Sequence, residues 1–395
     1  MAFLGTAVRD YRFGLMQELM DREGLDALAF LTSDFFQFAT NFHTDVQPWE
    51  RPIVAIVPRN GTPFVLLNEL STHHWRFSEQ AQRLWITDTS FYAEHPRVGA
   101  RLPLVTQWTD LAAQRLKQAG LATGRIGTDS GGGPLFRVPT LLPKLKLEPI
   151  VPQMRDLRLV KHPEEIALMR EIGKLSDWVQ DRFRENIRPG RLVQELDATM
   201  CAAMAEEGGR RFPGQQLEVR CWTLSGPASC APHGDGQPAG ARIETGHGLV
   251  NIVIPRVNGL VVENERTWFC GKPNAEQEKL FETARAANAA AIDAAVTGQP
   301  VCGIDAAAQA VIEKAGFGDL IMHRTGHGMG TLGHEFPEDM AFNTRPLMER
   351  EVYSAEPGLY RWGLGGFRHD DTVVVGATPE TITNAPKDIH SQTVL

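Results

Sequence analysis

The chain has 395 residues, of which 42% are hydrophobic and 22% are charged. At roughly 100–200 residues per domain, this length and this ordinary globular composition predict about two domains, each with a sizeable core. The formal net charge of −8 argues against nucleic acid or an anionic membrane as a partner, and no apolar run approaches the ~18 residues that a membrane span needs.

The five cysteines have no Cys-x-x-Cys spacing, and their small, odd number favours reduced thiols over a disulfide framework. The N-terminal segment MAFLGTAVRDYRFGLMQELMDREG is charged throughout and lacks the apolar stretch of a signal peptide, so it predicts an amphipathic helix. Both features predict a soluble cytoplasmic protein.

After this helix, short apolar runs predict strands over residues 25–31, 53–58 and 64–67. The last two flank Asn60-Gly61, a dipeptide typical of tight turns, so they are predicted to pair as a hairpin. Residues 111–119 predict a helix that ends at Gly120. Because strands alternate with helices, residues 1–153 are predicted to form a small α/β domain.

A second domain is predicted over residues 154–395, after a change in composition near Val151-Pro152. Pro163 and the two glutamates after it predict the start of a helix, because proline and negative charge are both favoured in a first turn. Helices are predicted over residues 163–185, 192–207, 275–295 and 304–315. Strands and a hairpin turn are predicted near Cys221, Val250 and Asn258-Gly259. This mixture of antiparallel hairpins and long helices indicates an α+β domain.

Histidines and carboxylates gather in five short segments of this second half. They are His233 in a loop of Gly and Pro, Glu263 and Glu265 on the second strand of the hairpin, His327 and His334 in a glycine-rich stretch, Glu356 before a turn, and Asp370 before a strand. The two glutamates of the hairpin alternate and therefore share one face, where two carboxylates are costly if they are buried. A lone histidine or carboxylate is more often structural or solvated, but together these residues supply bases, acids and potential metal ligands.

In their order and local sequence, these segments resemble the creatinase/aminopeptidase P superfamily, also called the M24 or pita-bread superfamily. MRDLRLVKHPEEIALMR resembles the join between its two domains, and its site motifs are similar to SGPASCAPHGDG, NGLVVENERT, GHGMGTLGHE, EPG and GFRHDDTVVV. The resemblance covers about residues 155–380 and extends weakly into GLDALAFLTSDFFQFATNF. It implies an α+β fold with a pita-bread C-terminal domain and a smaller α/β, creatinase-like N-terminal domain.

The metal positions depart from those of the family's peptidases, which use Asp, Asp, His, Glu and Glu. The first Asp falls on Asn251 or Ile252, and neither is a carboxylate. Glu263 stands in place of the second Asp, and Asp370 stands in place of the last Glu. The other two ligands match, at His327 and Glu356. Losing one carboxylate and changing two others predicts a protein without a metal cofactor. The alternative is one divalent transition metal held by these same four residues.

Creatinase and ectoine hydrolase are metal-free relatives, and creatinase ends the same hairpin in a Glu-Arg-Thr like Glu265-Arg266-Thr267. The resemblance therefore implies a creatinase-like hydrolase that cleaves a C–N bond of a small cationic, amidine or amide molecule. His233 is expected to act as base toward water and as acid toward the leaving nitrogen. The other expected roles are binding and orienting the substrate for Glu265 and Glu356, hydrogen bonding to the reacting group for His327 and His334, and filling the former metal pocket for Glu263 and Asp370.

A metal-dependent Xaa-Pro dipeptidase or aminopeptidase with a divergent site is the second interpretation. A metal-dependent lyase and a non-catalytic binding module of the same fold are further alternatives. The resemblance also implies a homodimer in which the N-terminal domain of one chain caps the other chain's site, with Arg51 as the candidate that reaches across. Glu338 completes the predicted substrate-binding residues; creatinase carries an arginine at this position, four residues after His334, so creatine itself is not the expected substrate.

Overall fold

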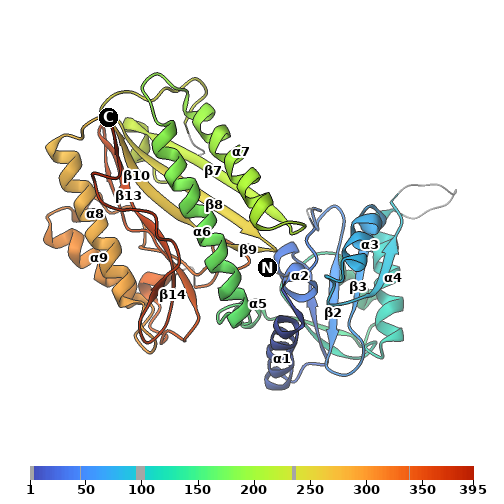
Figure 1. Cartoon of the computed structure of the whole chain (residues 1–395). Coiled ribbons are helices and arrows are strands. Elements are labelled where there is room, and N and C mark those ends of the chain that lie inside the picture. The colour runs from blue at the N-terminus through green and yellow to red at the C-terminus, as the bar shows by residue number, and fades with distance from the viewer. Residues whose placement is uncertain (1–3, 45, 95–102, 234–236, 338) are drawn as a thin grey trace. The chain divides into compact units, whose positions relative to one another are not determined.

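The computed structural model describes residues 4–44, 46–94, 103–233, 237–337 and 339–395. The chain forms two compact units, of which the first ends at Arg158 and the second begins at Leu159 (Figure 1). The boundary expected from the sequence, after residue 153, lies within helix α5 (Val151–Asp156), and Met154 of this helix is part of the core of the first unit. None of the described helices combines the length and the apolarity that crossing a bilayer requires.

The first unit is built on a six-stranded mixed sheet with the order β4-β3-β2-β1-β5-β6. The strands are β1 (Ala27–Phe30), β2 (Val54–Pro58), β3 (Phe64–Asn68), β4 (Asp88–Tyr92), β5 (Arg125–Thr128) and β6 (Lys146–Pro149). β2 runs antiparallel to β1 and β3, whereas the pairs β1–β5, β5–β6 and β3–β4 are parallel. The β2–β3 hairpin turns at the predicted dipeptide, where Gly61 adopts a φ of 121°.

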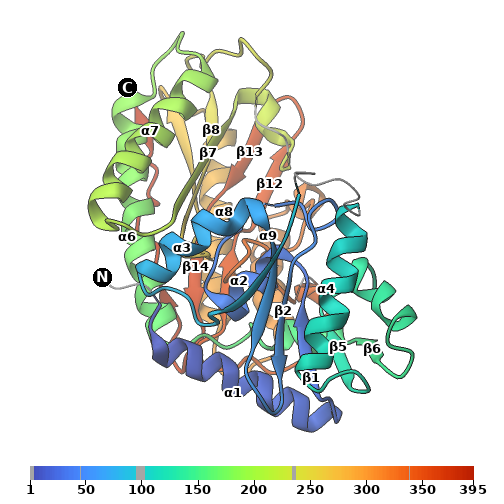
Figure 2. The ribbon, with the colours of Figure 1, turned by 90° about the vertical axis from the view of Figure 1, so that its right-hand side faces the viewer.

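Helices pack on both faces of this sheet (Figure 2). Besides α5 they are α1 (Thr6–Glu23), α2 (Ser33–Thr40), α3 (Thr72–Gln80) and α4 (Leu104–Gln118). Because side chains alternate along a strand, Phe30 of β1 lies in one core with Met16 of α1, whereas Ala29 lies in the other core with Trp108 of α4. α4 begins before the predicted residue 111 because the buried Trp108 continues its apolar stripe.

The second unit contains an eight-stranded sheet with the central order β11-β14-β10-β8-β7, in which neighbouring strands are antiparallel. These strands are β7 (Leu217–Ser225), β8 (Gly248–Val257), β10 (Asn264–Cys270), β11 (Val352–Ala355) and β14 (Asp370–Val374). Three short strands pair with them, namely β9 (Leu260–Val261), β15 (Glu380–Thr381) and β16 (Thr393–Val394). A separate two-stranded sheet consists of β12 (Gly358–Arg361) and β13 (Gly365–Arg368).

Two pairs of long helices lie on opposite sides of this sheet (Figure 1). They are α6 (Pro163–Asn186) with α7 (Val193–Arg211), and α8 (Ala275–Ala294) with α9 (Cys302–Lys314). Short 3₁₀ helices span Glu69–Ser71, Pro134–Thr140, Gly226–Cys230, Gly318–Leu320 and Met340–Phe342. The predicted α+β class is confirmed, with the antiparallel sheet as the central layer of the second unit.

The starts of two of these helices are specified by local sequence. α6 begins at Pro163 because His162 and Glu165 form a capping box. The side chain of Glu165 accepts a hydrogen bond from the backbone N–H of His162, and Nδ1 of His162 accepts one from the backbone N–H of Glu164. α8 begins in the same way, since Asn274 and Gln277 form a second capping box. These motifs explain why both helices begin where the sequence predicted.

The hairpin that carries Glu263 and Glu265 turns at Asn258 and Gly259, whose φ angles of 49° and 85° suit a tight two-residue turn. The second strand was predicted to be continuous, but it is divided into β9 and β10. The ladder with β8 is interrupted opposite Pro255, which has no backbone N–H to donate. It resumes at Asn264, opposite Val253, without a change in register.

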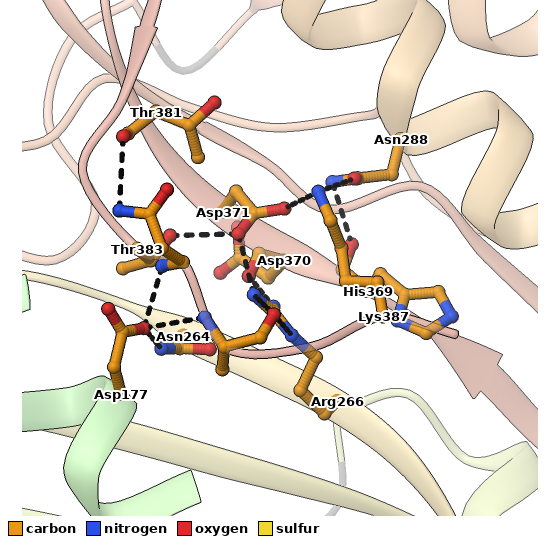
Figure 3. A network of polar contacts seen from close by, with 12 residues as sticks. Asp177, Asn264, Arg266, Asn288, His369, Asp370, Asp371, Thr381, Thr383 and Lys387 are labelled. Atoms are coloured by element: carbon orange, nitrogen blue, oxygen red, sulfur yellow. Dashed lines mark hydrogen bonds and ion pairs between the residues drawn. The ribbon is translucent and has the colours of Figure 1, made fainter. Parts of the chain in front are cut away.

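A buried polar network links β10 and β14 to the C-terminal segment (Figure 3). Arg266 is fully buried and its Nη2 donates to Oδ1 of Asp371 at 2.8 Å. It also donates to the main-chain carbonyl oxygens of Asp370 and Ala385. Lys387 binds the second carboxylate oxygen of Asp371 at 2.7 Å. The network therefore ties β10 and β14 to the C-terminal segment that carries Ala385 and Lys387.

Replacing Arg266 with methionine is expected to lower the free energy of unfolding by about 3–5 kcal/mol, because Asp371 loses its main buried partner. Equilibrium unfolding in denaturant measures this change. Arg170→Met is the matched control, since the ion pair between Arg170 and Glu380 is exposed and such pairs contribute roughly 0–1 kcal/mol. Equal losses in the two variants would show that the network does not stabilise the fold.

Candidate active site

A cavity of about 550 Å³ lies on the face of the second unit's sheet that is turned away from α6 and α7. Alternation along the strands produces this face. Asn264, the first residue of β10, donates to Ser176 of α6, whereas Glu263 just before it and Glu265 just after it line the cavity. The two glutamates therefore lie on one face of the hairpin, as the alternation of side chains predicts, and both are buried.

One row of paired residues crosses four strands on the cavity face. Trp222 of β7 lies opposite Ile252 of β8, Ile252 lies opposite Glu265 of β10, and Glu265 lies opposite Asp370 of β14. Directly opposite residues of antiparallel strands are neighbours on the same face. Ile252, not Asn251, is thus the residue of β8 that faces the carboxylates, and it supplies no ligand.

Asn251 faces the other side of the sheet. Its Nδ2 donates to Oε1 of Gln180 on α6 at 2.9 Å, and its Oδ1 accepts from the backbone of Arg266. The sequence left two positions open for the first metal-ligating aspartate of the peptidase pattern. The register of β8 and β10 excludes Asn251 from the cavity.

His327 is buried beside two carboxylates. Its Nδ1 lies 3.1 Å from the carbonyl oxygen of Gly328, which only accepts, so Nδ1 carries the proton. Its Nε2 lies 3.4 Å from Oε2 of Glu263 and 3.3 Å from Oε1 of Glu356. Burial disfavours charge on this imidazole, but the two carboxylates raise the pKa of His327 well above its ordinary value. The space around Nε2 therefore requires a proton or a metal cation.

The glycines on either side of His327 make room for neighbouring backbone. A Cβ at Gly326 would overlap the carbonyl of Ser354, and a Cβ at Gly328 would overlap that of Phe336. Neither glycine is therefore free to carry a side chain. They let the His327 segment pass close to β11 and to the segment before Pro337, which holds the imidazole in place.

Two further histidines continue from His327 along the cavity. The ring of His334 stacks on that of His327 with centroids 3.7 Å apart, and the ring of His233 lies 6.1 Å from that of His334. Burial, followed by the charge of His327, lowers the pKa of His334, so it is neutral near pH 7. The structure thus brings together all three predicted histidines.

Glu265, Glu356 and Asp370 form an acidic group next to His327. Burial raises the pKa of Glu265 to about 8. Burial and the charges of Glu265, Glu356 and Glu263 raise the pKa of Asp370 well above its ordinary value. One oxygen of Asp370 accepts from Ser354, and the other has no hydrogen-bond partner among the described residues. So many buried carboxylates favour a bound cation.

Arg368 is a site residue to which the sequence assigned no role. It is buried against Glu265, to which its Nη2 donates at 3.0 Å, and its Nη1 lies 3.9 Å from Glu356. Its Nη1 also lies 3.3 Å from the hydroxyl of Tyr360. Arg368 lies two residues before Asp370, the predicted site residue at the start of β14, and this spacing was the sequence signal that could have identified it. Arg368 offsets the charge of Glu265 more than that of the other carboxylates.

Of the two remaining predicted residues, only Arg51 is described, and it does not line this cavity. Arg51 belongs to the first unit, where its guanidinium binds Glu94 at 2.8 Å and Glu50 at 2.8 Å. Its expected role in a partner's site stays a prediction. Glu338 lies outside the described residues.

Residues 167–377, more than half of the chain, match the model of metallopeptidase family M24. The chain belongs to this family. The resemblance inferred from the sequence motifs is therefore confirmed at the level of the superfamily.

Individual M24 proteins extend this likeness. The Xaa-Pro dipeptidase of Pyrococcus furiosus is 31% identical over 222 residues, which are 56% of this chain and 62% of that protein. "Probable dipeptidase PepE" of Mycobacterium tuberculosis is 29% identical over 355 residues, 87% of this chain and 86% of that protein. The crystal structure of dipeptidase PepE from Mycobacterium ulcerans has a TM-score of 0.80 at 24% identity and covers 100% of both chains. The predicted pita-bread fold is thus confirmed, and these relatives support a hydrolase of peptide C–N bonds better than a creatinase-like enzyme.

The prediction that this M24 protein has no cofactor is wrong. The family is one of metallopeptidases, and the cavity holds two groups of potential ligands whose donor atoms lie within 4.8 Å of one another. The groups are Glu263, His327 and His334, and Glu265, Glu356 and Asp370. The error came from counting carboxylates position by position, because Glu265 faces the cavity directly opposite Ile252 and keeps the number of carboxylates high.

These residues fit a divalent transition cation. A metal-ligating histidine commonly donates its other N–H to a backbone carbonyl, as His327 does to Gly328. Its Nε2 lies between carboxylate oxygens of Glu263 and Glu356, and imidazole with carboxylate is a donor set typical of transition metals. Arg368 engages Glu265, so the donors around His327 fit one cation better than a bridged pair.

Proposed function

We propose that the protein is a metal-dependent dipeptidase, a hydrolase that cleaves the amide bond of a short peptide with one divalent transition cation per chain. The observation that carries this proposal is the position of His327, whose buried Nε2 is turned toward Glu263 and Glu356 at one end of the cavity. The family and the dipeptidases among the relatives support the proposal.

Glu263, His327 and Glu356 would hold the cation, with Asp370 close enough to Glu356 to complete its surroundings. When bound, a divalent cation supplies Lewis acidity toward the amide carbonyl and lowers the pKa of water. The protein itself excludes bulk water from this end, because His327, Glu263 and Asp370 are buried. Arg266 and Ser354 fix the strand segments and the carboxylate of Asp370.

The histidines that line the open part of the cavity handle protons. His334 is neutral near pH 7 and stacks on His327, so it is placed to accept a proton from the water that attacks the amide carbon. His233 lies beyond it on an exposed loop and is placed to give a proton to the leaving nitrogen. Together the two roles move a proton from water to the leaving amine within one row of imidazoles.

The cavity also suits a small zwitterionic substrate. Its volume of about 550 Å³ lies within the roughly 300–1,000 Å³ of small-molecule sites. Glu263, Glu265 and Glu356 gather at one end of the cavity, which favours a substrate ammonium group there. Trp222, Ile254 and Leu332 provide apolar surface for side chains. A dipeptide matches this combination of size, charge and apolar lining.

A substrate panel tests the proposal. Purified protein supplied with Mn²⁺ is expected to hydrolyse alanyl-alanine or alanyl-proline, and a chelator is expected to abolish the activity until Mn²⁺ is restored. Hydrolysis of creatine or other small amidines by the chelator-treated protein, without dipeptide cleavage, would contradict the proposal. Failure to cleave any member of the panel with Mn²⁺ present would favour a binding module instead.

A further inference from the structure

Arg220 lies on the cavity face of the edge strand β7. It alternates with Cys221, which faces α7, and shares its face with Trp222. The guanidinium lies over the indole of Trp222, with its central carbon 4.2 Å from the ring centroid. This cation–π contact orients a guanidinium that is otherwise exposed to the cavity.

Arg220 differs from the other arginines of the cavity wall in its partners. Arg256 contacts Glu218 at 3.3 Å, and Arg368 binds Glu265. Within the described part of the chain, Arg220 makes no ion pair and no hydrogen bond to a carboxylate. It is therefore the cation of the cavity whose charge is available to a ligand.

The sheet sets the distance between Arg220 and the predicted metal ligands. Arg220 pairs with Ile254 on β8, and β10 with its glutamates follows as the next strand. Two strand spacings amount to about 10 Å, whereas one extended residue spans at most about 3.6 Å. The long side chain of Arg220 spans the part of this distance that one substrate residue does not. A dipeptide whose scissile bond lies near His327 thus places its second residue over Ile254 and its carboxylate toward Arg220.

We propose that Arg220 binds the free C-terminal carboxylate of the substrate and thereby makes the enzyme specific for dipeptides. This inference rests on the proposed dipeptidase function. A guanidinium binds a carboxylate through two parallel hydrogen bonds, and the stacking on Trp222 holds it ready for this contact. The cavity is then polarised along the substrate, with carboxylates near its ammonium end and Arg220 near its carboxylate end.

Arg220→Met is expected to raise KM for alanyl-alanine while leaving kcat nearly unchanged, because the contact is made equally in the ground state and the transition state. The expected loss in kcat/KM is roughly 10- to 150-fold, which corresponds to a hydrogen-bonded contact with a charged group. Alanyl-alanine amide lacks the carboxylate, so its hydrolysis should barely change. Arg220→Lys should restore part of the preference for the acid over the amide. Arg188→Met, an exposed arginine outside the cavity wall, is the matched control.

Calorimetric binding separates this inference from the proposed function. The probes are alanyl-alanine with a reduced, uncleavable peptide bond, as the free acid and as the amide, titrated into the Mn²⁺-loaded protein. The acid should bind more tightly to the wild type, and Arg220→Met should remove that difference. Absence of dipeptide hydrolysis overturns the dipeptidase but leaves this binding difference to decide the role of Arg220. An equal preference for the acid in wild type and Arg220→Met, or no preference in the wild type, overturns the role of Arg220.

Discussion

Replacing His327 with alanine is expected to lower kcat/KM for dipeptide hydrolysis by at least about 100-fold. Removing a residue that only hydrogen-bonds to a metal ligand already costs up to about 100-fold, and His327 is itself a proposed ligand. The same variant should bind Mn²⁺ more weakly by a similar factor. The reason is geometric: Nδ1 is committed to Gly328, so Nε2 is the one atom of this ring that can act between Glu263 and Glu356.

Calorimetric titration of Mn²⁺ and steady-state kinetics on the same sample measure both effects. Because His327 is buried, its loss could also unfold the protein, so His327→Asn, which keeps much of the volume, is measured beside the alanine variant. His390→Ala provides the control, since His390 is exposed and lies outside the cavity wall. Folded His327 variants that bind Mn²⁺ like the wild type would exclude His327 as a ligand.

Replacing His233 with alanine is expected to lower kcat by about 10²–10⁴-fold, the range of general acid–base catalysis. Mn²⁺ affinity should not change, because His233 is separated from His327 by the ring of His334. The fold should not change either, since His233 lies on an exposed loop. Loss of kcat with normal metal binding therefore distinguishes a proton-transfer role from a ligand role.

The measurement is the pH profile of kcat for the wild type and for His233→Ala, with metal content recorded for each. A leaving group that needs no protonation, such as an activated amide, should be cleaved with a much smaller loss. If His233→Ala keeps the full kcat and the full pH profile, the proton is transferred by another group, with His334 as the nearest imidazole.

Much of the fold could be predicted because short motifs specify it locally. Pro163 with Glu165, and Asn258 with Gly259, fix a helix start and a hairpin turn through contacts within a few residues. The division of β9 from β10 follows from Pro255 on the partner strand, which a residue-by-residue pattern of the second strand cannot show.

The site could be predicted only as a set of residues. Motif order identified the histidines and carboxylates, but the choice between Asn251 and Ile252 required the register of β8 against β10. The pair of Arg368 with Glu265 joins residues 103 positions apart in the chain. Arg220 and Trp222 show the alternation of a strand, yet their side of the sheet depends on how α7 packs.

The error about the metal has the same physical origin. The sequence indicated a missing carboxylate and two exchanged ones, and from this a metal-free site was expected. In the folded chain Glu265 faces the cavity beside Asp370, and His327 is held with Nε2 between two carboxylates. Ligand geometry depends on which atoms converge, and substitutions counted along the chain do not report it.

Metal stoichiometry with activity on the same sample tests the central claim most directly. The purified 395-residue chain is stripped with a chelator, titrated with Mn²⁺, and assayed for bound metal and for alanyl-alanine hydrolysis at each step. We predict activity that rises with occupancy and saturates at about one cation per chain. Full dipeptide hydrolysis by the stripped protein, or saturation of binding without any gain in activity, would contradict a metal-dependent dipeptidase.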